Sequence, residues 1–103
     1  MSEAQSFAEQ YPQIHTAMLQ MQKQCAAWGP LDERTRALIE LVIASVRMQP
    51  SGVRAQAARA LKQGITAEEV RHAILLTLGG CGYSSVMASL AAANEVLNGT
   101  PLR

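Results

Sequence analysis

The sequence predicts an all-α protein, a bundle of about five helices in a single domain that spans residues 1–103. Three observations predict this class. Apolar residues make up 49% of the chain but aromatic residues only 4%, and small aliphatic side chains suit closely packed helices better than strands. Apolar residues recur with a seven-residue period through residues 7–28. Proline, glycine and capping residues then divide the rest of the chain into helix-sized segments.

Composition also excludes several classes of partner and location. The net charge is +1, with acidic and basic residues interspersed, so we expect neither a nucleic-acid partner nor binding to an anionic membrane. The first residues lack the basic and apolar segments of a secretion signal. No apolar run reaches the roughly 18 residues that cross a bilayer. Cys25 and Cys81 match no metal or redox spacing, which predicts a soluble, cytoplasmic protein with reduced thiols.

The first helical segment, residues 1–30, carries one narrow apolar stripe. Its members are separated alternately by four and three positions: Phe7, Tyr11, Ile14, Met18, Met21, Cys25 and Trp28. This heptad period predicts a helix that packs along a partner helix. Because a helix tolerates proline in its first turn, Pro12 predicts a short helix up to Gln10 and a main helix from about residue 12 to 27. Cys25, inside the stripe, is expected to be buried in the core.

The second helix is predicted over residues 35–48, with Asp32 or Thr35 as its N-cap. Its interior is apolar almost all the way round, which is typical of a central helix surrounded by others. Glu40 is the exception in this segment. We expect it to form an ion pair with Arg36 or Arg47, or to be a buried acid or base with a raised pKa.

Three further helices are predicted after a break at residues 49–52. Ser51 is the expected cap of the third helix, which ends at Gly64. Its expected inner stripe is Val53, Ala57, Ala60 and Leu61, and its expected outer, solvated side is Arg54, Arg59 and Lys62. Thr66 and Glu69 form a capping box that starts the fourth helix. The glycines at 79, 80 and 82 interrupt that helix, at a point where the backbone bends or lies close to another group. A fifth helix follows over about residues 84–97, and residues 98–101 end it.

Two segments resemble the carboxymuconolactone decarboxylase and alkylhydroperoxidase-D-like superfamily. Residues 31–39, LDERTRALI, resemble the family's L-D-x-R-T-R-E-L-I, and residues 60–70, ALKQGITAEEV, resemble its A-L-x-x-G-x-T-x-E-E-I. Residues 82–85, GYSS, stand where the decarboxylase branch shows G-F-P-A. The likeness covers residues 31–97, the family-like core. It implies an alkylhydroperoxidase-D-like helical fold that assembles into homo-trimers or homo-hexamers, with active sites near the subunit contacts.

The thiols of the peroxidase branch are missing from this sequence. The resemblance implies a C-x-x-C pair, a histidine and a glutamate, and alignment on Gly64 places these at Gln49, Gly52, Gln56 and Ala37. Peroxidase chemistry requires a reactive thiolate and a second thiol that resolves the disulfide. Activity of the C-x-x-C type is therefore not expected.

The decarboxylase branch leaves a different set of candidate residues. Decarboxylation needs a cation for the carboxylate, an electron sink in the substrate and an acid that protonates the carbanion. Gln56, His72 and Glu40 are the candidate catalytic residues, although a glutamine donates a hydrogen bond but carries no titratable proton. The candidate substrate-binding residues are Arg47, Gln49, Ser51, Arg54 and Tyr83. For each of these a purely structural role, in a cap, an ion pair or a solvated helix face, stays open.

Three functions follow from these residues. The first is a cofactor-free enzyme of the decarboxylase-like branch that acts on a small organic acid or lactone. The second is a catalytically silent oligomer of the same fold that binds or scaffolds a partner. The third is a redox protein that uses Cys81, which lies in the glycine-rich segment where free backbone amides favour a thiolate. No metal is expected, because His15 and His72 have no companion ligands at a suitable spacing.

Overall fold

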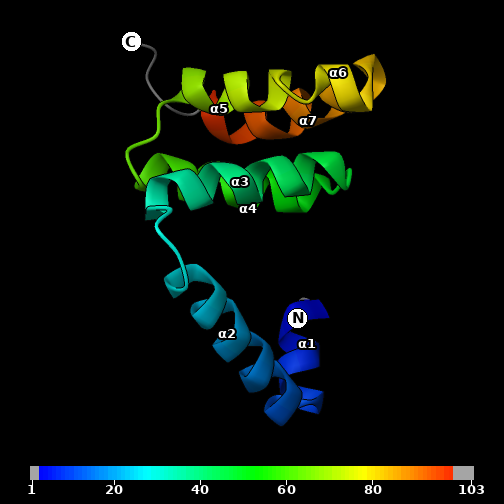
Figure 1. Ribbon diagram of the computed structural model, residues 1–103. Coiled ribbons are helices and arrows are strands. Elements are labelled where there is room, and N and C mark those ends of the chain that lie inside the picture. Colours follow the sequence, from blue (N-terminus) through cyan, green and yellow to red (C-terminus); the bar gives the residue numbers. More distant parts are fainter. Residues whose placement is uncertain (1–2, 99–103) are drawn as a thin grey trace. The chain divides into compact units, whose positions relative to one another are not determined.

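The computed structural model describes residues 3–98, and every regular element in this range is a helix, without a strand, which confirms the predicted all-α class. The chain divides into two units, one ending at Leu31 and the other starting at Asp32. Figure 1 labels the helices in chain order. They are α1 (Glu3–Gln10), α2 (Pro12–Ala27), α3 (Glu33–Val46), α4 (Pro50–Lys62), α5 (Ala67–Leu75), α6 (Leu78–Cys81) and α7 (Tyr83–Leu97).

The first unit is a hairpin of α1 and α2. Both predicted boundaries around Pro12 are confirmed, because α1 ends at Gln10 and α2 begins at the proline and ends at Ala27. The prediction that Cys25 lies in a core is wrong for the single chain, since its thiol is exposed and α2 contains no buried residue. Two short helices cover each other only along their single line of contact. The apolar side chains of the stripe that lie off this contact therefore stay exposed.

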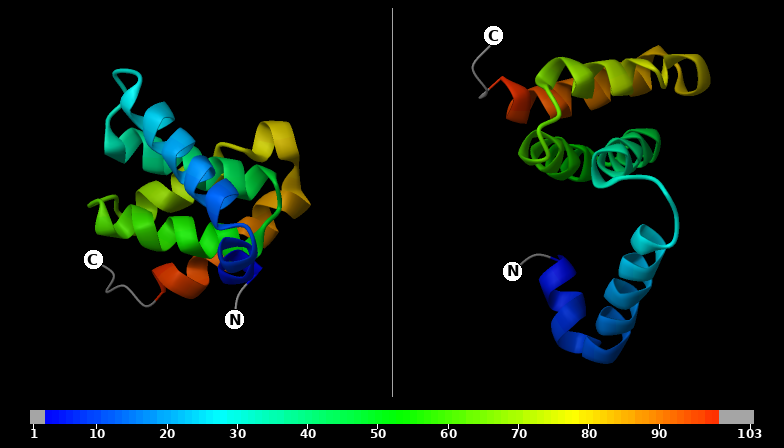
Figure 2. Two further views of the ribbon diagram at one scale, coloured as in Figure 1. Left: turned by 90° about the horizontal axis from the view of Figure 1, so that it is seen from below. Right: turned by 60° about the vertical axis from the view of Figure 1, so that its left-hand side comes forward.

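The second unit has two layers of helices, one formed by α3 and α4 and the other by α5, α6 and α7 (Figure 2). The core lies between and within these layers, and small residues allow the helices to approach closely. Its buried apolar members are Ala37, Leu41, Ala44, Val53, Ala57, Ala60, Ile65, Val70, Ala73, Ile74, Val86, Ala92, Ala93 and Leu97. The predicted inner stripe of the third helix therefore lies in the core, with Leu61 at its edge.

The helix starts follow from local capping, with one correction. Asp32 caps α3 by accepting a 2.8 Å hydrogen bond from the backbone N–H of Thr35. The capping box of Thr66 and Glu69 is present at the start of α5, as predicted. The prediction that Ser51 caps α4 is wrong, because Gln49 occupies the N-cap and Pro50 is the first helical residue. Proline suits that position because its fixed φ is already helical and the missing N–H has no acceptor there.

The prediction that the second helix is surrounded on all sides is also wrong for the single chain. Ala37, Leu41 and Ala44 of α3 are buried, but Ile39 and Ile43 expose 42% and 49% of their surface. Within this unit, α3 packs mainly against α4, α5 and α7, and these helices leave part of its apolar surface uncovered. Some apolar residues of α3 therefore do not enter the core and instead form an exposed apolar face.

The glycine-rich segment turns the chain from α5 into α7. Leu78–Cys81 form a single helical turn, α6, and a Cβ added at Gly79 or Gly80 would meet nothing within 4 Å, so no close approach occurs at these two positions. Gly82 has φ +86° and ψ 170°, a conformation that requires glycine. Of the predicted end of the last helix, Asn98 is its C-cap, and residues 99–101 lie outside the described residues. No described helix is long and apolar enough to cross a membrane.

Candidate functional site

Three polar side chains meet along the seam between α3 and α4. The Nη1 atom of Arg59 donates to Oε2 of Glu40 over 3.1 Å and to Oε1 of Gln56 over 3.4 Å. The Glu40 and Arg59 side chains keep 52% and 35% of their surface exposed. Glu40 thus pairs with Arg59 of the neighbouring helix, which was not among its expected partners, Arg36 and Arg47. The prediction of a buried Glu40 is wrong, because half of its side chain is exposed.

Helix geometry explains why these residues share the seam. Gln49, Gly52, Gln56 and Arg59 are spaced by three or four positions, so they follow one face of α4. A Cβ added at Gly52 would lie 3.4 Å from the Cβ atoms of Ala44 and Gln49, which shows that this face lies against α3. The loop between the two helices contains Met48 with φ +55°, and this left-handed residue reverses the chain direction.

The remaining predicted binding residues of α3 and α4 lie apart from this cluster. Arg54 approaches Glu95 of α7, with 3.5 Å between Nη1 and Oε2. Arg47 is the exposed C-cap of α3, and Ser51 is exposed in the first turn of α4. The structure therefore brings Glu40 and Gln56 together through Arg59, with Gln49 further along the same face, and leaves Arg54 on the α7 side.

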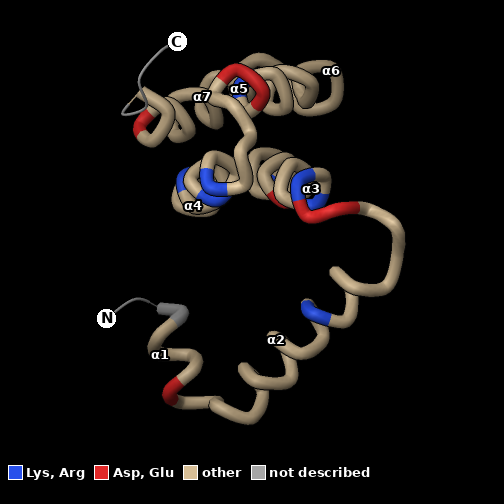
Figure 3. The backbone as a smooth tube through the Cα atoms, turned by 90° about the vertical axis from the view of Figure 1, so that its left-hand side faces the viewer, with Lys and Arg blue, Asp and Glu red and all other residues tan. Residues whose placement is uncertain are grey.

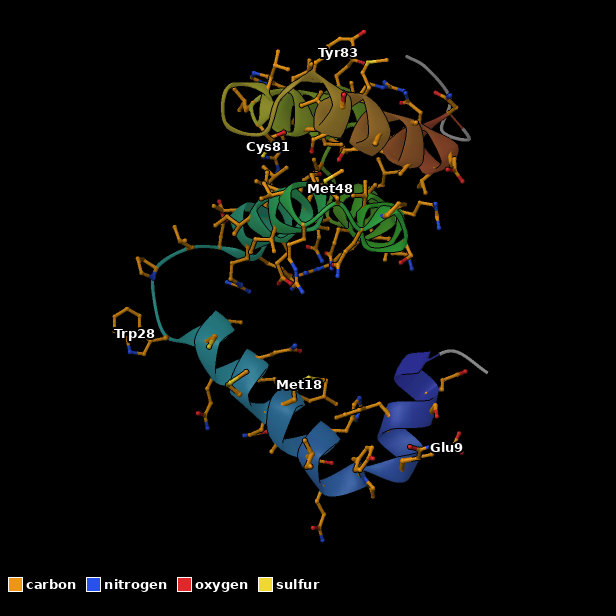
Figure 4. The ribbon with its side chains drawn as sticks, turned by 90° about the vertical axis from the view of Figure 1, so that its right-hand side faces the viewer. Glu9, Met18, Trp28, Met48, Cys81 and Tyr83 are labelled. Atoms are coloured by element: carbon orange, nitrogen blue, oxygen red, sulfur yellow. The ribbon has the colours of Figure 1, made fainter. Side chains whose placement is uncertain are left out.

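The predicted residues of the other layer are exposed or only partly covered. His72 is exposed on α5, and Tyr83 exposes 71% of its surface on the side of α7 away from α3 and α4 (Figure 4). Cys81 is partly buried at the end of α6. In the described part of the chain, no hydrogen bond joins any of these three side chains to Glu40, Gln56 or Arg59.

An apolar groove lies between α3 and the end of α5. Its volume is about 380 Å³, and no charged side chain lines it. The residues that line it are Thr35, Leu38, Ile39, Val42, Ile43, Ala73, Leu76 and Thr77. None of them was among the predicted site residues. The signal in the sequence was the apolar pattern around the whole circumference of α3, which indicates a second contact surface in addition to the core.

Acidic residues lie at the starts of α3 and α5 (Figure 3), and two of these carboxyl groups have lowered pKa values. The Arg34 guanidinium donates to both carboxylate oxygens of Glu69, at 2.6 and 2.7 Å, and together with the N–H of Thr66 it lowers the pKa of Glu69 to about 2. Hydrogen bonds from the Thr35 side chain and backbone lower the pKa of Asp32. Both carboxylates complete caps, so these shifts indicate structural roles.

Arg59 is the functional candidate that sequence reasoning missed. Its position on the outer side of the third helix predicted a solvated side chain, whereas the structure places it between Glu40 and Gln56. Of the three guanidinium nitrogens of Arg59, only Nη1 donates side-chain hydrogen bonds to other described residues. Its Nη2 and Nε groups are therefore available to a ligand. A planar guanidinium binds carboxylates through two parallel bonds. No group of three or more His, Cys, Asp or Glu in the described chain could hold a metal.

Comparison with known families gives one match. Residues 12–95 match the family described as the carboxymuconolactone decarboxylase family. The match begins in α2 and ends in α7, so it includes the α3–α4 seam and the apolar groove. No curated protein and no solved structure matches the chain.

Proposed function

The chain belongs to the carboxymuconolactone decarboxylase family, and from this membership we propose that it is a cofactor-free enzyme acting on a small organic acid or lactone at the α3–α4 seam. The observation that carries the proposal is the sharing of Arg59 Nη1 between Glu40 and Gln56. It unites a cation, a carboxylate and an amide on one accessible surface. These are groups that a carboxylate or lactone substrate can use.

Each of the three side chains has a chemical role in this proposal. Arg59 holds the substrate carboxylate, or polarises a lactone carbonyl, with the Nη2 and Nε groups. In decarboxylation the electron pair of the breaking C–C bond moves into a conjugated carbonyl of the substrate as CO₂ leaves. A water molecule held by the Glu40 carboxylate donates a proton to the resulting carbanion, and the released CO₂ takes up the hydroxide that remains, as bicarbonate. Gln56 orients Arg59 and offers its N–H₂ group to a substrate oxygen.

The other predicted residues enter this proposal differently. Arg47 and Gln49 flank the α3–α4 turn and stay predicted substrate ligands, as do Ser51 and Tyr83. Arg54 serves as a ligand only if it leaves Glu95. His72 stays a predicted proton donor, and it can act only if a group from outside the second unit brings the substrate to it. A cytoplasmic location also stays a prediction from the sequence.

We also propose that the chain assembles into a homo-trimer or homo-hexamer. The exposed apolar residues of α3, Ile39, Ile43 and Val46, support self-association, because contiguous apolar surface on a soluble protein marks an interaction site. Such an assembly would enclose surfaces that are open in one chain. Enclosure strengthens the electrostatic interactions on which catalysis depends.

A thermal-shift screen with small carboxylic acids and lactones tests the function. A ligand at about 100 times its dissociation constant adds about 2.7 kcal/mol to the free energy of unfolding, which raises the melting temperature of a domain this size by several degrees. We expect the shift to be lost in Arg59→Met and kept in Lys62→Met, which removes the same charge from the next turn of α4. Any compound that stabilises the wild type is then incubated with it to detect CO₂ release or lactone opening.

Several results would count against the proposal. An equal ligand shift in Arg59→Met and in the wild type would remove the α3–α4 seam as the binding site. A panel without any shift, or binding without turnover, would favour a silent oligomer of the same fold. A Cys81→Ser variant that loses reactivity toward an oxidant would favour the redox alternative.

A further inference from the structure

The α1–α2 hairpin carries an apolar stripe that the hairpin itself does not cover. Ile14 and Met21 of α2 expose 59% and 56% of their surface, and Trp28, just beyond the helix, exposes 88% (Figure 4). The ring of Phe7 in α1 lies 5.2 Å from that of Tyr11 and 6.4 Å from that of His15, so α1 packs on the first turns of α2 and leaves the rest open. Exposed apolar surface of this extent favours association.

The spacing of the stripe indicates the kind of partner. Tyr11, Ile14, Met18, Met21 and Cys25 follow a period of 3.5 residues. At this period the side chains of one helix fit between those of a second helix along its whole length. A second copy of α2 has the same period, so its side chains stay in step with the first.

The surface of the stripe also suits a copy of itself. A hollow of about 400 Å³ at its C-terminal end is lined by Met21, Gln24, Cys25 and Trp28, and it can receive an apolar side chain. The only charged residue of α2 is Lys23, which is not a member of the stripe. Two stripes can therefore meet without burying an unpaired charge.

We propose that the α2 stripe is an interface between two copies of this chain, in which two α1–α2 hairpins pair into a four-helix bundle. Each copy contributes its α1–α2 hairpin, and two hairpins supply the four helices of the bundle. Such a contact uses the same surface of both copies and joins them in pairs. It is thus consistent with a hexamer made of three pairs. It does not depend on the chemistry at Arg59.

The wild-type protein provides the first test. The molar mass is measured by light scattering over a dilution series, together with the emission of Trp28, the single tryptophan of the chain. We expect the mass to fall on dilution and the emission maximum to move to longer wavelength in the same concentration range, because Trp28 leaves the interface. A monomer at all concentrations, or an assembly that dissociates without any change in Trp28 emission, would overturn the proposal.

Three variants locate the interface. Met21→Glu places a charge in the stripe and should halve the molar mass, while its circular dichroism stays helical. Gln20→Glu is the matched control, because Gln20 is exposed on the same helix outside the stripe, and it should keep the wild-type mass. Ile43→Glu alters the α3–α5 groove and should retain at least the paired form. A wild-type mass for Met21→Glu, or a monomer for Ile43→Glu, would overturn the proposal.

Discussion

Arg59 and Glu40, which lie 19 positions apart in the sequence, are joined across the α3–α4 seam by a hydrogen bond of 3.1 Å. The same Arg59 nitrogen also reaches Gln56, one turn earlier on α4. Neither helix alone assembles this group. The seam therefore places polar side chains beside Ile39 and Ile43, the apolar residues that α3 also exposes.

The Arg59–Glu40 ion pair should contribute little to stability. Both side chains are partly exposed, and such pairs are worth roughly 0–1 kcal/mol. We expect Glu40→Gln to lower the free energy of unfolding, measured by urea denaturation, by less than about 1 kcal/mol. Glu95→Gln, which weakens the longer Arg54 contact, is the control and should change it no more. A loss of several kcal/mol in Glu40→Gln alone would indicate that Glu40 supports the fold.

The Arg34–Glu69 contact should make stability depend on acidic pH. The pKa of Glu69 falls from its ordinary value of 4.5 to about 2 in the folded protein. A lowered carboxyl pKa stabilises the fold above pH 4.5, and this contribution is lost as the pH falls from 4.5 to about 2. Salt should weaken the effect, because both side chains are more than 40% exposed. In an NMR titration of Glu69, Arg34→Met should raise the pKa toward 4.5, and an unchanged titration would contradict the assignment.

The caps of α4 and α5 predict different losses of stability for the same kind of substitution. Thr66 accepts a 3.1 Å hydrogen bond from the N–H of Glu69, so Thr66→Ala should reduce the free energy of unfolding by about 1 kcal/mol. Ser51 is an exposed first-turn residue without a capping bond, and Ser51→Ala should be near neutral. Thermal or urea unfolding of both variants measures the difference. Equal losses of unfolding free energy in the two variants would indicate that Ser51 caps α4 after all.

The glycines around α6 should differ sharply in their tolerance of alanine. Gly82→Ala imposes a Cβ on a backbone with φ +86° and ψ 170°, at a cost of order 1–3 kcal/mol. Gly79→Ala, in an open helical turn, should be neutral or slightly stabilising, because alanine favours helix. Melting temperatures of the two variants check this, and equal values would be inconsistent with the α6–α7 turn described above.

Much of the fold could be predicted because its signals are local. Pro12 and Ala27 bound α2, the capping box starts α5, and Gly64 and Gly82 have the positive φ angles that end or redirect helices. Each of these effects acts within a few residues, so the sequence contains it directly. Ser51 was misassigned because Pro50, one position earlier, is better suited to the first turn and moves the cap to Gln49.

The candidate site was predictable only in part. Gln56 and Glu40 were identified, the first from the family resemblance and the second from its unusual surroundings in the sequence. Their connection through Arg59 was not, because it depends on how α3 and α4 pack. Helical periodicity placed Arg59 on an outer face, but it does not specify which residue of a neighbouring helix faces that position.

The sequence by itself determined the helical class, the positions of most helix ends and the family of this protein, because periodicity, caps and motifs depend on neighbouring residues. Tertiary structure alone decided that Glu40 meets Arg59 and that Ile39 and Ile43 stay exposed. It also decided that an apolar groove lies between α3 and the end of α5. The physical reason is that burial and charge pairing depend on side chains far apart in the chain, which become neighbours only when the helices pack.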